Sequence, residues 1–163
     1  MLKVNSQNLY MLSNRKSHRL NDKSRFEQRR QNMLMVRHAM LRNIVTADPK
    51  TSIKTAIKML YEKHIGSLLV IDSHQKCIGI FTERDAIRLV AQGVNLGSPI
   101  TEAMTSNVTT IGEEASLEEA RRLIVTHAIR HLPVVNGEGK LVGLLSVRKL
   151  LDEFFGLQSS KYC

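Results

Sequence analysis

The feature that most constrains this chain is one sequence unit that occurs twice, with a constant offset of 64 residues and no gap. Ala39-Met40 aligns with Ala103-Met104, and identities continue to Arg84 and Arg148. Two copies of one unit predict two half-domains packed as a pair, with ligand clefts where the copies face each other. A unit of this length, present only twice, does not fit a solenoid. Between those limits the identical pairs include Asn43/Asn107, Thr46/Thr110, Ser52/Ser116, Ile65/Ile129, Val70/Val134, Lys76/Lys140 and Gly79/Gly143.

Each copy has the pattern of a β-α-β-β-α unit. In the first copy we expect a strand at 44–47 and an amphipathic helix from Ile53 to Tyr61, with Ser52 or Thr51 as its N-cap. Two apolar runs separated by a short turn then predict a buried hairpin, and a second helix closes the unit. The runs are Ser67–Ile71 and Cys77–Phe81, the closing helix is Glu83–Gln92, and the second copy has the corresponding segments up to a closing helix at Val147–Phe155.

The net charge of +9 comes mostly from the N-terminal region. Residues 1–38 hold nine Lys and Arg against two acids, which leaves fifteen against thirteen for the rest. Such a tail is typical of an arm that binds nucleic acid or another anionic surface, and a polar helix at 22–31 is one form it could take. The alternatives are a solvated extension or an upstream start, because Met33 and Met35 could each begin a shorter chain.

Cysteine and hydropathy patterns favour a protein of the reducing cell interior. Cys77 lies in an apolar run and Cys163 is the last residue, so we expect no bridge between them. The sequence has no CxxC pair and no Cys/His cluster with the spacing of a metal site. It has no apolar run of about 18 residues and no secretory segment, so we expect a cytoplasmic protein without membrane contact.

The junction between the last strand and the closing helix is the first candidate binding feature. In the first copy it reads GIFTERD, with Thr82 where the helix begins and Asp85 three residues later. The N–H groups of a helix N-terminus suit a polar or anionic ligand, and a carboxylate can accept hydrogen bonds from a vicinal diol such as a ribose. The same spacing is also a favourable helix start that needs no ligand.

The second copy has a basic character at the same place. Lys149 occupies the position of Asp85, where a cation opposes the helix dipole. Arg130 and His131 precede the second copy's central strand, and together with Arg148 they could form a basic lip for phosphate. Alternatively, Arg130 pairs with a surface acid and His131 is a half-buried structural histidine.

Taken together, residues 36–156 resemble a tandem pair of CBS (cystathionine-β-synthase type) domains, known as a Bateman module. The resemblance lies in the double β-α-β-β-α unit, the strand phrases GSLLVID and RHLPVVN, and the junction phrases GIFTERD and GLLSVRK. It implies an α/β (α+β) fold with pseudo-twofold packing. The domains it implies are a basic extension at 1–35, CBS domains at 36–96 and 97–157, and a tail at 158–163.

The resemblance also implies site residues. Asp85 would hold the ribose hydroxyls and Thr82 would support the sugar, while Val45, Ile65, Gly66 and Ile80 would line an adenine slot. Arg130, His131 and Arg148 would reach the phosphates from the second copy. Because Lys149 replaces the expected acid, we expect the symmetry-related cleft at Ser146 and Lys149 to be empty or weaker.

The function we expect from this resemblance is a non-enzymatic adenine-nucleotide sensor. Its ligand would be AMP, ADP or ATP, with NAD or S-adenosylmethionine less favoured, and it would use no catalytic cofactor and no metal. A homodimer is expected, with Leu89, Val90, Phe154 and Phe155 as interface residues. The alternative is a nucleic-acid-binding or scaffold protein that acts through residues 1–34, with the nucleotide as a gate.

Overall fold

The computed structural model describes residues 34–155, and both repeat copies lie in one compact unit. The first copy comprises β1 (Thr46–Ala47), α3 (Ile53–Glu62), β2 (Ser67–Ile71), β3 (Cys77–Thr82) and α4 (Glu83–Ala91). The second comprises β4 (Ile111–Gly112), α5 (Leu117–Thr126), β5 (His131–Val135), β6 (Leu141–Ser146) and α6 (Val147–Phe155). The predicted β-α-β-β-α order is confirmed in both copies. The predicted helix at 22–31, the rest of the basic extension up to residue 33, the tail at 158–163 and Cys163 lie outside the described residues.

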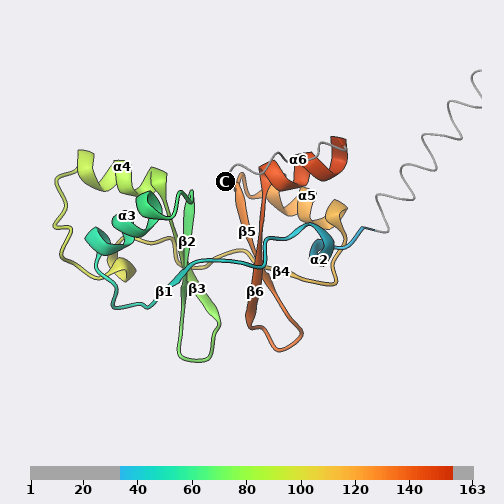
Figure 1. Cartoon of the computed structure of the whole chain (residues 1–163), viewed down its shortest axis with the longest axis horizontal. Helices are drawn as coiled ribbons and strands as arrows, with labels where there is room; N and C mark the ends of the chain where they lie inside the picture. The colour runs from blue at the N-terminus through green and yellow to red at the C-terminus, as the bar shows by residue number, and fades with distance from the viewer. Residues whose placement is uncertain (1–33, 156–163) are drawn as a thin grey trace, which may run out of the picture. The chain divides into compact units, whose positions relative to one another are not determined.

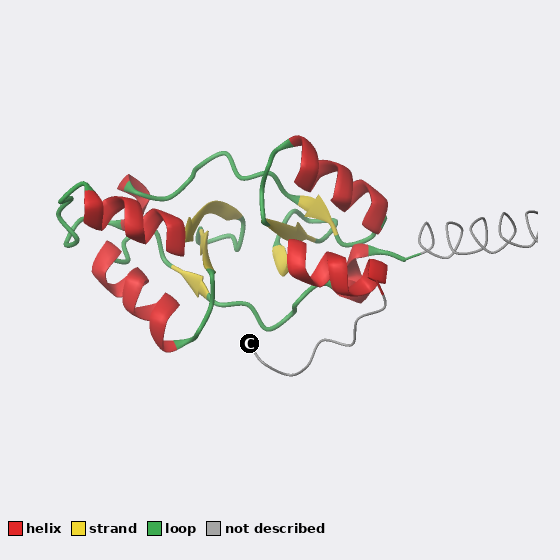
Figure 2. Ribbon diagram, turned by 90° about the horizontal axis from the view of Figure 1, so that it is seen from above, coloured by secondary structure: helices red, strands yellow, loops and turns green. Residues whose placement is uncertain are grey.

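Each copy forms a three-stranded sheet in which the first strand of the hairpin lies in the middle. The orders are β1-β2-β3 and β4-β5-β6, with a parallel pair followed by an antiparallel hairpin in each. Figure 1 shows the four long helices at one end of these strands and the hairpin turns at the other. Seen from above, the strands of the two copies face each other and the helices lie to the outside (Figure 2).

Helix starts in the two copies use the same side-chain chemistry. Ser52 Oγ accepts the N–H of Thr55, and Ser116 Oγ accepts the N–H of Glu119. Each bond satisfies one of the free N–H groups in the first turn of a helix, which stabilises the helix by about 1 kcal/mol. The predicted caps are therefore present, and they fix where α3 and α5 begin.

The core of each copy is completed by a segment that precedes the other copy. We call residues 35–41 and 99–105 the leading segments. The first contains α2 (Val36–Ala39), and the second contains the short helix η1 (Ile100–Glu102). Ile100 and Ala103 are buried with Phe81 in the first copy's core. These apolar side chains are buried against the sheet of the other copy and are thereby removed from water.

The first leading segment makes the equivalent contacts with the second copy. The N–H of Val36 donates to Ala115 O at 2.9 Å, and Val36 is fully buried. Leu41 and Leu144 exchange two backbone hydrogen bonds, at 2.9 and 3.0 Å. The predicted domains at 36–96 and 97–157 thus each contribute their first residues to the other's core. Neither leading helix was predicted, because a single turn carries too little periodicity to be recognised.

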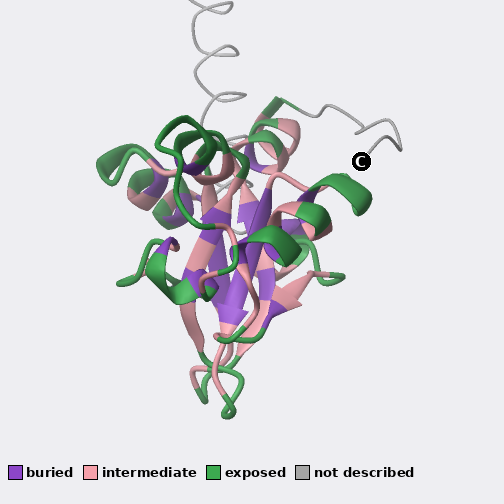
Figure 3. Cartoon of the chain, turned by 90° about the vertical axis from the view of Figure 1, so that its left-hand side faces the viewer, coloured by how far each residue is buried: buried purple, intermediate pink, exposed green. Residues whose placement is uncertain are grey.

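Two glycines allow the leading segments to approach the strands closely. A Cβ at Gly143 would lie 2.6 Å from Met40 Sδ, and one at Gly79 would overlap the Met104 thioether. The repeated Ala-Met and Gly positions are therefore a packing pair used twice. Figure 3 shows the buried residues concentrated along the strands. Leu89, expected at an interface, is instead 3% exposed and belongs to the first copy's core.

Candidate functional site

A cavity of about 760 Å³ lies between the two copies. The first copy contributes the residues around the start of β2, and the second contributes the start of β5 and the junction of β6 with α6. The cavity is lined by Leu41, Asn43, Ile44, Val45, His64, Ile65, Gly66, Ser67, Leu69 and Glu83 from the first half of the chain, and by Arg130, His131, Leu144, Ser146, Val147, Arg148, Leu151 and Asp152 from the second.

One wall of the cavity is apolar. Val45 and Ile65 come from the first copy, and Leu144 comes from β6 of the second. Leu41 is held beside Leu144 by the paired backbone hydrogen bonds of the first leading segment. Such a wall can take the faces of a planar ring, while the nearby backbone groups can read its edge.

Three basic side chains also line the cavity: Arg130, His131 and Arg148. Burial lowers the pKa of His131 below its ordinary value, the charge of Arg130 lowers it further, and Glu83 acts in the raising direction. The lowered pKa favours the neutral imidazole of His131, and a nearby anion would favour its protonated form. These groups can bind a phosphate by charge and by hydrogen bonds.

Gly66 lines the cavity from the first copy and lies close to His131 of the second. A Cβ placed on it would be 3.6 Å from Glu83 Oε2 and 3.7 Å from His131 Nε2. Glycine therefore keeps the backbone accessible beside one acid and one imidazole. Its counterpart in the repeat is Arg130, so the two copies are chemically different at this point.

The structure does not bring together all the residues predicted for the site. Six of them line the cavity: Val45, Ile65, Gly66, Arg130, His131 and Arg148. Ile80, Thr82 and Asp85 are not among the lining residues. The cavity instead takes its strand-to-helix junction, Ser146–Arg148, from the second copy, which is the cleft that we expected to be empty or weaker.

The reason is the strand order. β2 lies between β1 and β3, so the residues before β1 and the end of β3 are at opposite edges of the same sheet. The β3 edge meets the second leading segment, where Ile80 and Thr105 exchange backbone hydrogen bonds. A cleft that contains Val45 must therefore draw its junction from β6. Val45 precedes β1 and Asp85 follows β3, so the two lie towards opposite edges of this sheet, and the shared ligand role expected for them stays a prediction.

Asp85 is engaged in the start of α4. Its Oδ2 accepts the N–H of Thr82 at 2.9 Å and the Thr82 hydroxyl at 2.7 Å, while Oδ1 accepts from Arg88 at 3.1 Å. Thr82 Oγ1 in turn accepts the N–H of Asp85, which completes a capping box. The favourable helix start considered from the sequence is present.

Several lining residues were not predicted. Leu41 and Asn43 precede the first strand, and the identity of Asn43 with Asn107 across the repeat was the available signal. Glu83 and Asp152 lie on helices and had no distinguishing pattern of their own. Their position becomes evident only when the copies are packed together.

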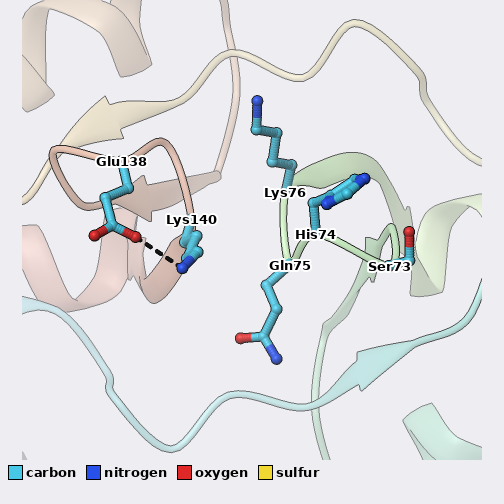
Figure 4. Close-up of a pocket in the computed structure, with 6 residues that line it drawn as sticks. All are labelled: Ser73, His74, Gln75, Lys76, Glu138 and Lys140. Atoms are coloured by element: carbon cyan, nitrogen blue, oxygen red, sulfur yellow. Dashed lines mark ion pairs between the residues drawn. The ribbon is translucent and has the colours of Figure 1, made fainter.

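A second cavity, of about 840 Å³, lies between the tips of the two hairpins (Figure 4). Its lining is entirely polar, with Lys76 and Lys140 at equivalent positions of the repeat. Lys140 Nζ is 2.7 Å from Glu138 Oε2, and both side chains are about half exposed or more. It has no apolar wall that would hold a ring, so the first cavity is the better candidate for a nucleotide.

Residues 34–155 contain neither a membrane-spanning helix nor a cluster of metal ligands. Within that range no helix is long and apolar enough to cross a membrane. In the same part of the chain, no group of three or more His, Cys, Asp and Glu residues is placed to hold a metal ion.

Comparison with known proteins agrees with this architecture. The family model described as "CBS domain" matches residues 36–92 and 100–156. An uncharacterised 17.7 kDa protein of Acidianus ambivalens is 35% identical over 119 residues, which cover 73% of this chain and 72% of that protein. Longer curated relatives are matched over as little as 22% or 23% of their length.

Solved structures are similar over most of the described residues. The CBS domain protein PAE2072 of Pyrobaculum aerophilum, complexed with AMP, is 25% identical with a TM-score of 0.68, over 76% of this chain and 99% of that one. The CBS domain pair of protein MJ0100, in complex with 5′-methylthioadenosine and S-adenosyl-L-methionine, is 28% identical with a TM-score of 0.70. That match covers 77% of this chain and 98% of the other.

Proposed function

We propose that this chain, which belongs to the CBS domain family, is a non-enzymatic regulatory module that binds an adenine nucleotide in the cavity between its two copies. The observation that carries the proposal is the composition of that cavity. An apolar wall around Val45, Ile65 and Leu144 faces the basic groups Arg130, His131 and Arg148, so one ligand could place a ring on the first and a phosphate on the second.

The position of the cavity supports a regulatory role. Its lining comes from both copies, so a ligand bound there contacts both and favours one arrangement of the pair. A ligand can shift a conformational equilibrium only by its differential affinity for the two states, and a cleft between two units provides that difference. The lining serines have structural roles, since Ser146 Oγ accepts the N–H of Lys149 and Ser67 is buried in β2.

The ligands proposed are AMP, ADP and ATP, with NAD and S-adenosylmethionine less favoured. The named complexes of PAE2072 with AMP and of MJ0100 with two adenosine derivatives support an adenosine-containing ligand. The ligand role of Ile80, Thr82 and Asp85 is proposed for a second, twofold-related position at the junction of β3 with α4, where Ile80 pairs with Thr105.

The direct test is a calorimetric titration of the full chain with AMP, ADP, ATP, NAD and S-adenosylmethionine. Saturable binding near one ligand per chain, with a preference among them, is expected. Arg148→Ala should weaken the binding of the phosphorylated ligands. The matched control is Arg121→Ala in α5, which removes an arginine paired with Glu118 and absent from the cavity lining. Failure of all five ligands to bind would contradict the proposal.

Self-association is the second part of the proposal. Exposed apolar side chains recur at equivalent positions of the two copies: Tyr61 and Val125 are 79% and 67% exposed, and Ile87 and Leu151 are 72% and 45% exposed. They lie on α3 to α6, whose helices share one end of the molecule in Figure 1. A surface that repeats about a pseudo-twofold axis fits a second copy of the same chain. Tyr61→Glu should lower the mass measured by light scattering if that copy is bound there.

The alternative function, nucleic-acid binding through residues 1–34, depends on a segment of which only Leu34 is described. It predicts salt-sensitive binding that is lost when residues 1–33 are deleted.

A further inference from the structure

The charged side chains that line the cavity nearly balance one another. Arg130 and Arg148 are cations, and Glu83 and Asp152 are the two carboxylates among the described lining residues. Burial and the charge of Arg130 lower the pKa of His131, which favours its neutral form. The arginines can still bind a phosphate, but the cavity offers little net positive charge to compensate a longer phosphate chain.

Glu83 is the carboxylate that lies beside the basic groups of the second copy. Its backbone N–H donates to Gly66 O at 3.3 Å, which fixes the first residue of α4 next to Gly66. Glu83 Oε2 and His131 Nε2 lie 3.6 and 3.7 Å from the point that a Cβ on Gly66 would occupy. The carboxylate and the imidazole therefore border the same small space, and the charge of Glu83 acts on the pKa of His131 in the raising direction.

The charge of Glu83 is not neutralised by a neighbour. Of the residues that the structure describes, none forms an ion pair with Glu83, and the same is true of Arg130 and Arg148. Asp152 differs, because it interacts with another group of the protein. A ligand in the cavity thus meets two arginines without ion-pair partners and, beside His131, one carboxylate without an ion-pair partner.

The fold does not require an acid at this position. The repeat places Val147 at the position of Glu83, and the Val147 N–H donates to Arg130 O at 3.0 Å in the same way as the Glu83 N–H donates to Gly66 O. The backbone contact is therefore made equally well by an apolar residue. The Glu83 carboxylate is exposed and adds nothing to this contact, so its effect falls on what enters the cavity.

We infer that Glu83 makes this cavity selective for an adenosine ligand with a single phosphate, because its carboxylate opposes the additional negative charge of a di- or triphosphate. The inference rests on the proposed function. Specificity of this kind arises from a repulsive group that acts against the competing ligand, in addition to the attractive groups that bind the favoured one. Like charges at short range disfavour each other, and each further phosphate brings more negative charge towards the same carboxylate.

The test compares adenosine, AMP, ADP and ATP by calorimetry with the full chain, in buffer without divalent cations. The unaltered protein should bind AMP at least about threefold more tightly than ATP, with ADP between them. Glu83→Gln keeps the shape of the side chain and removes its charge. It should lower the ratio of the ATP and AMP dissociation constants about threefold, which is the size of effect expected for an exposed charge, and leave adenosine unchanged.

Two variants serve as controls. Glu119→Gln removes the charge of an exposed glutamate of α5 that does not line the cavity, and it should leave the ratio unchanged. Asp152→Asn removes the other lining carboxylate, which already has a protein partner, and should change the ratio less than Glu83→Gln does. Thermal melting of each variant checks that it is folded.

The outcomes separate this inference from the proposed function. ATP binding as tightly as AMP to the unaltered protein, or an unchanged ratio in Glu83→Gln, would overturn the role of Glu83 and leave the nucleotide site standing. An equal gain for adenosine and ATP in Glu83→Gln would show an effect of shape and would also overturn it. A change in Asp152→Asn as large as that in Glu83→Gln would overturn the assignment to Glu83. If none of the four ligands binds the unaltered chain, the proposed function fails, and the inference fails with it.

Discussion

Replacing Gly143 by Ala should destabilise the protein by about 1–2 kcal/mol. The added Cβ would lie 2.6 Å from Met40 Sδ and 3.1 Å from the carbonyl oxygen of Leu41. The thioether can rotate away, but the Leu41 backbone is held by its two hydrogen bonds to Leu144. Overpacking of this kind costs about 1–3 kcal/mol, and the lower entropy of the unfolded Ala chain offsets roughly 0.4–1 kcal/mol.

Thermal melting measures this loss directly. For a folded region of this size, about 1 kcal/mol corresponds to roughly 4 °C in Tm, so Gly143→Ala should melt roughly 4–8 °C lower. At Gly79 the three nearest atoms all belong to the Met104 side chain, so Gly79→Ala should cost less. Gly137 has no atom within 4 Å of its added Cβ, and Gly137→Ala is the neutral control. Equal Tm values for Gly143→Ala and Gly137→Ala would refute the close packing of the first leading segment.

Three further predictions concern the site and the helix starts. Burial lowers the pKa of His131 in the folded protein, so this histidine binds a proton more readily in the unfolded chain. The contribution of His131 to the free energy of unfolding should therefore be complete above the ordinary histidine pKa and decrease as the pH falls below that pKa. Urea unfolding from pH 8 to 5 should show this fall, and His131→Gln should flatten it; an unchanged profile would exclude His131 as its source. Arg130→Ala should lower the affinity for AMP, measured by calorimetry, about tenfold, and the affinity for adenosine much less. An equal loss of affinity for both ligands would show that Arg130 does not contact phosphate. Thr82→Ala removes the N-cap of α4 and should lower the free energy of unfolding by about 0.5–2 kcal/mol. Thr101→Ala, at an exposed threonine, is the control. Equal melting temperatures for the two variants would argue against the capping box.

Local structure was largely predictable from the sequence because it depends on neighbours in the chain. The strand predicted at Ser67–Ile71 has the same bounds as β2, and the helix predicted at Val147–Phe155 has the same bounds as α6. Both have strong apolar patterns, with polar or capping residues at their ends. The strand before Ile53 was expected at 44–47 and is formed only at Thr46–Ala47, because its sole partner is the parallel β2.

The composition of the cavity was predictable only in part, because it depends on which copy supplies each wall. Arg130, His131 and Gly66 were predicted for one cleft, and all three line the cavity. Thr82 and Asp85 were predicted for the same cleft but do not line the cavity, because the sequence does not show that β3 pairs with the second leading segment. Asp152 was not recognised for the same reason.

The exchange of leading segments has a consequence for how such a chain could have arisen. A single ancestral copy would have had its core residue in the position of Ile100 on a segment that reaches outward, to be buried only in a second molecule. Such a unit would complete its core only by exchanging this segment with a second copy. Joining two genes would then have turned an encounter between molecules into a contact within one chain, at an effective concentration set by a short linker. Within the one chain, neither half has its complete core without the other, because each core includes a segment that precedes the other copy.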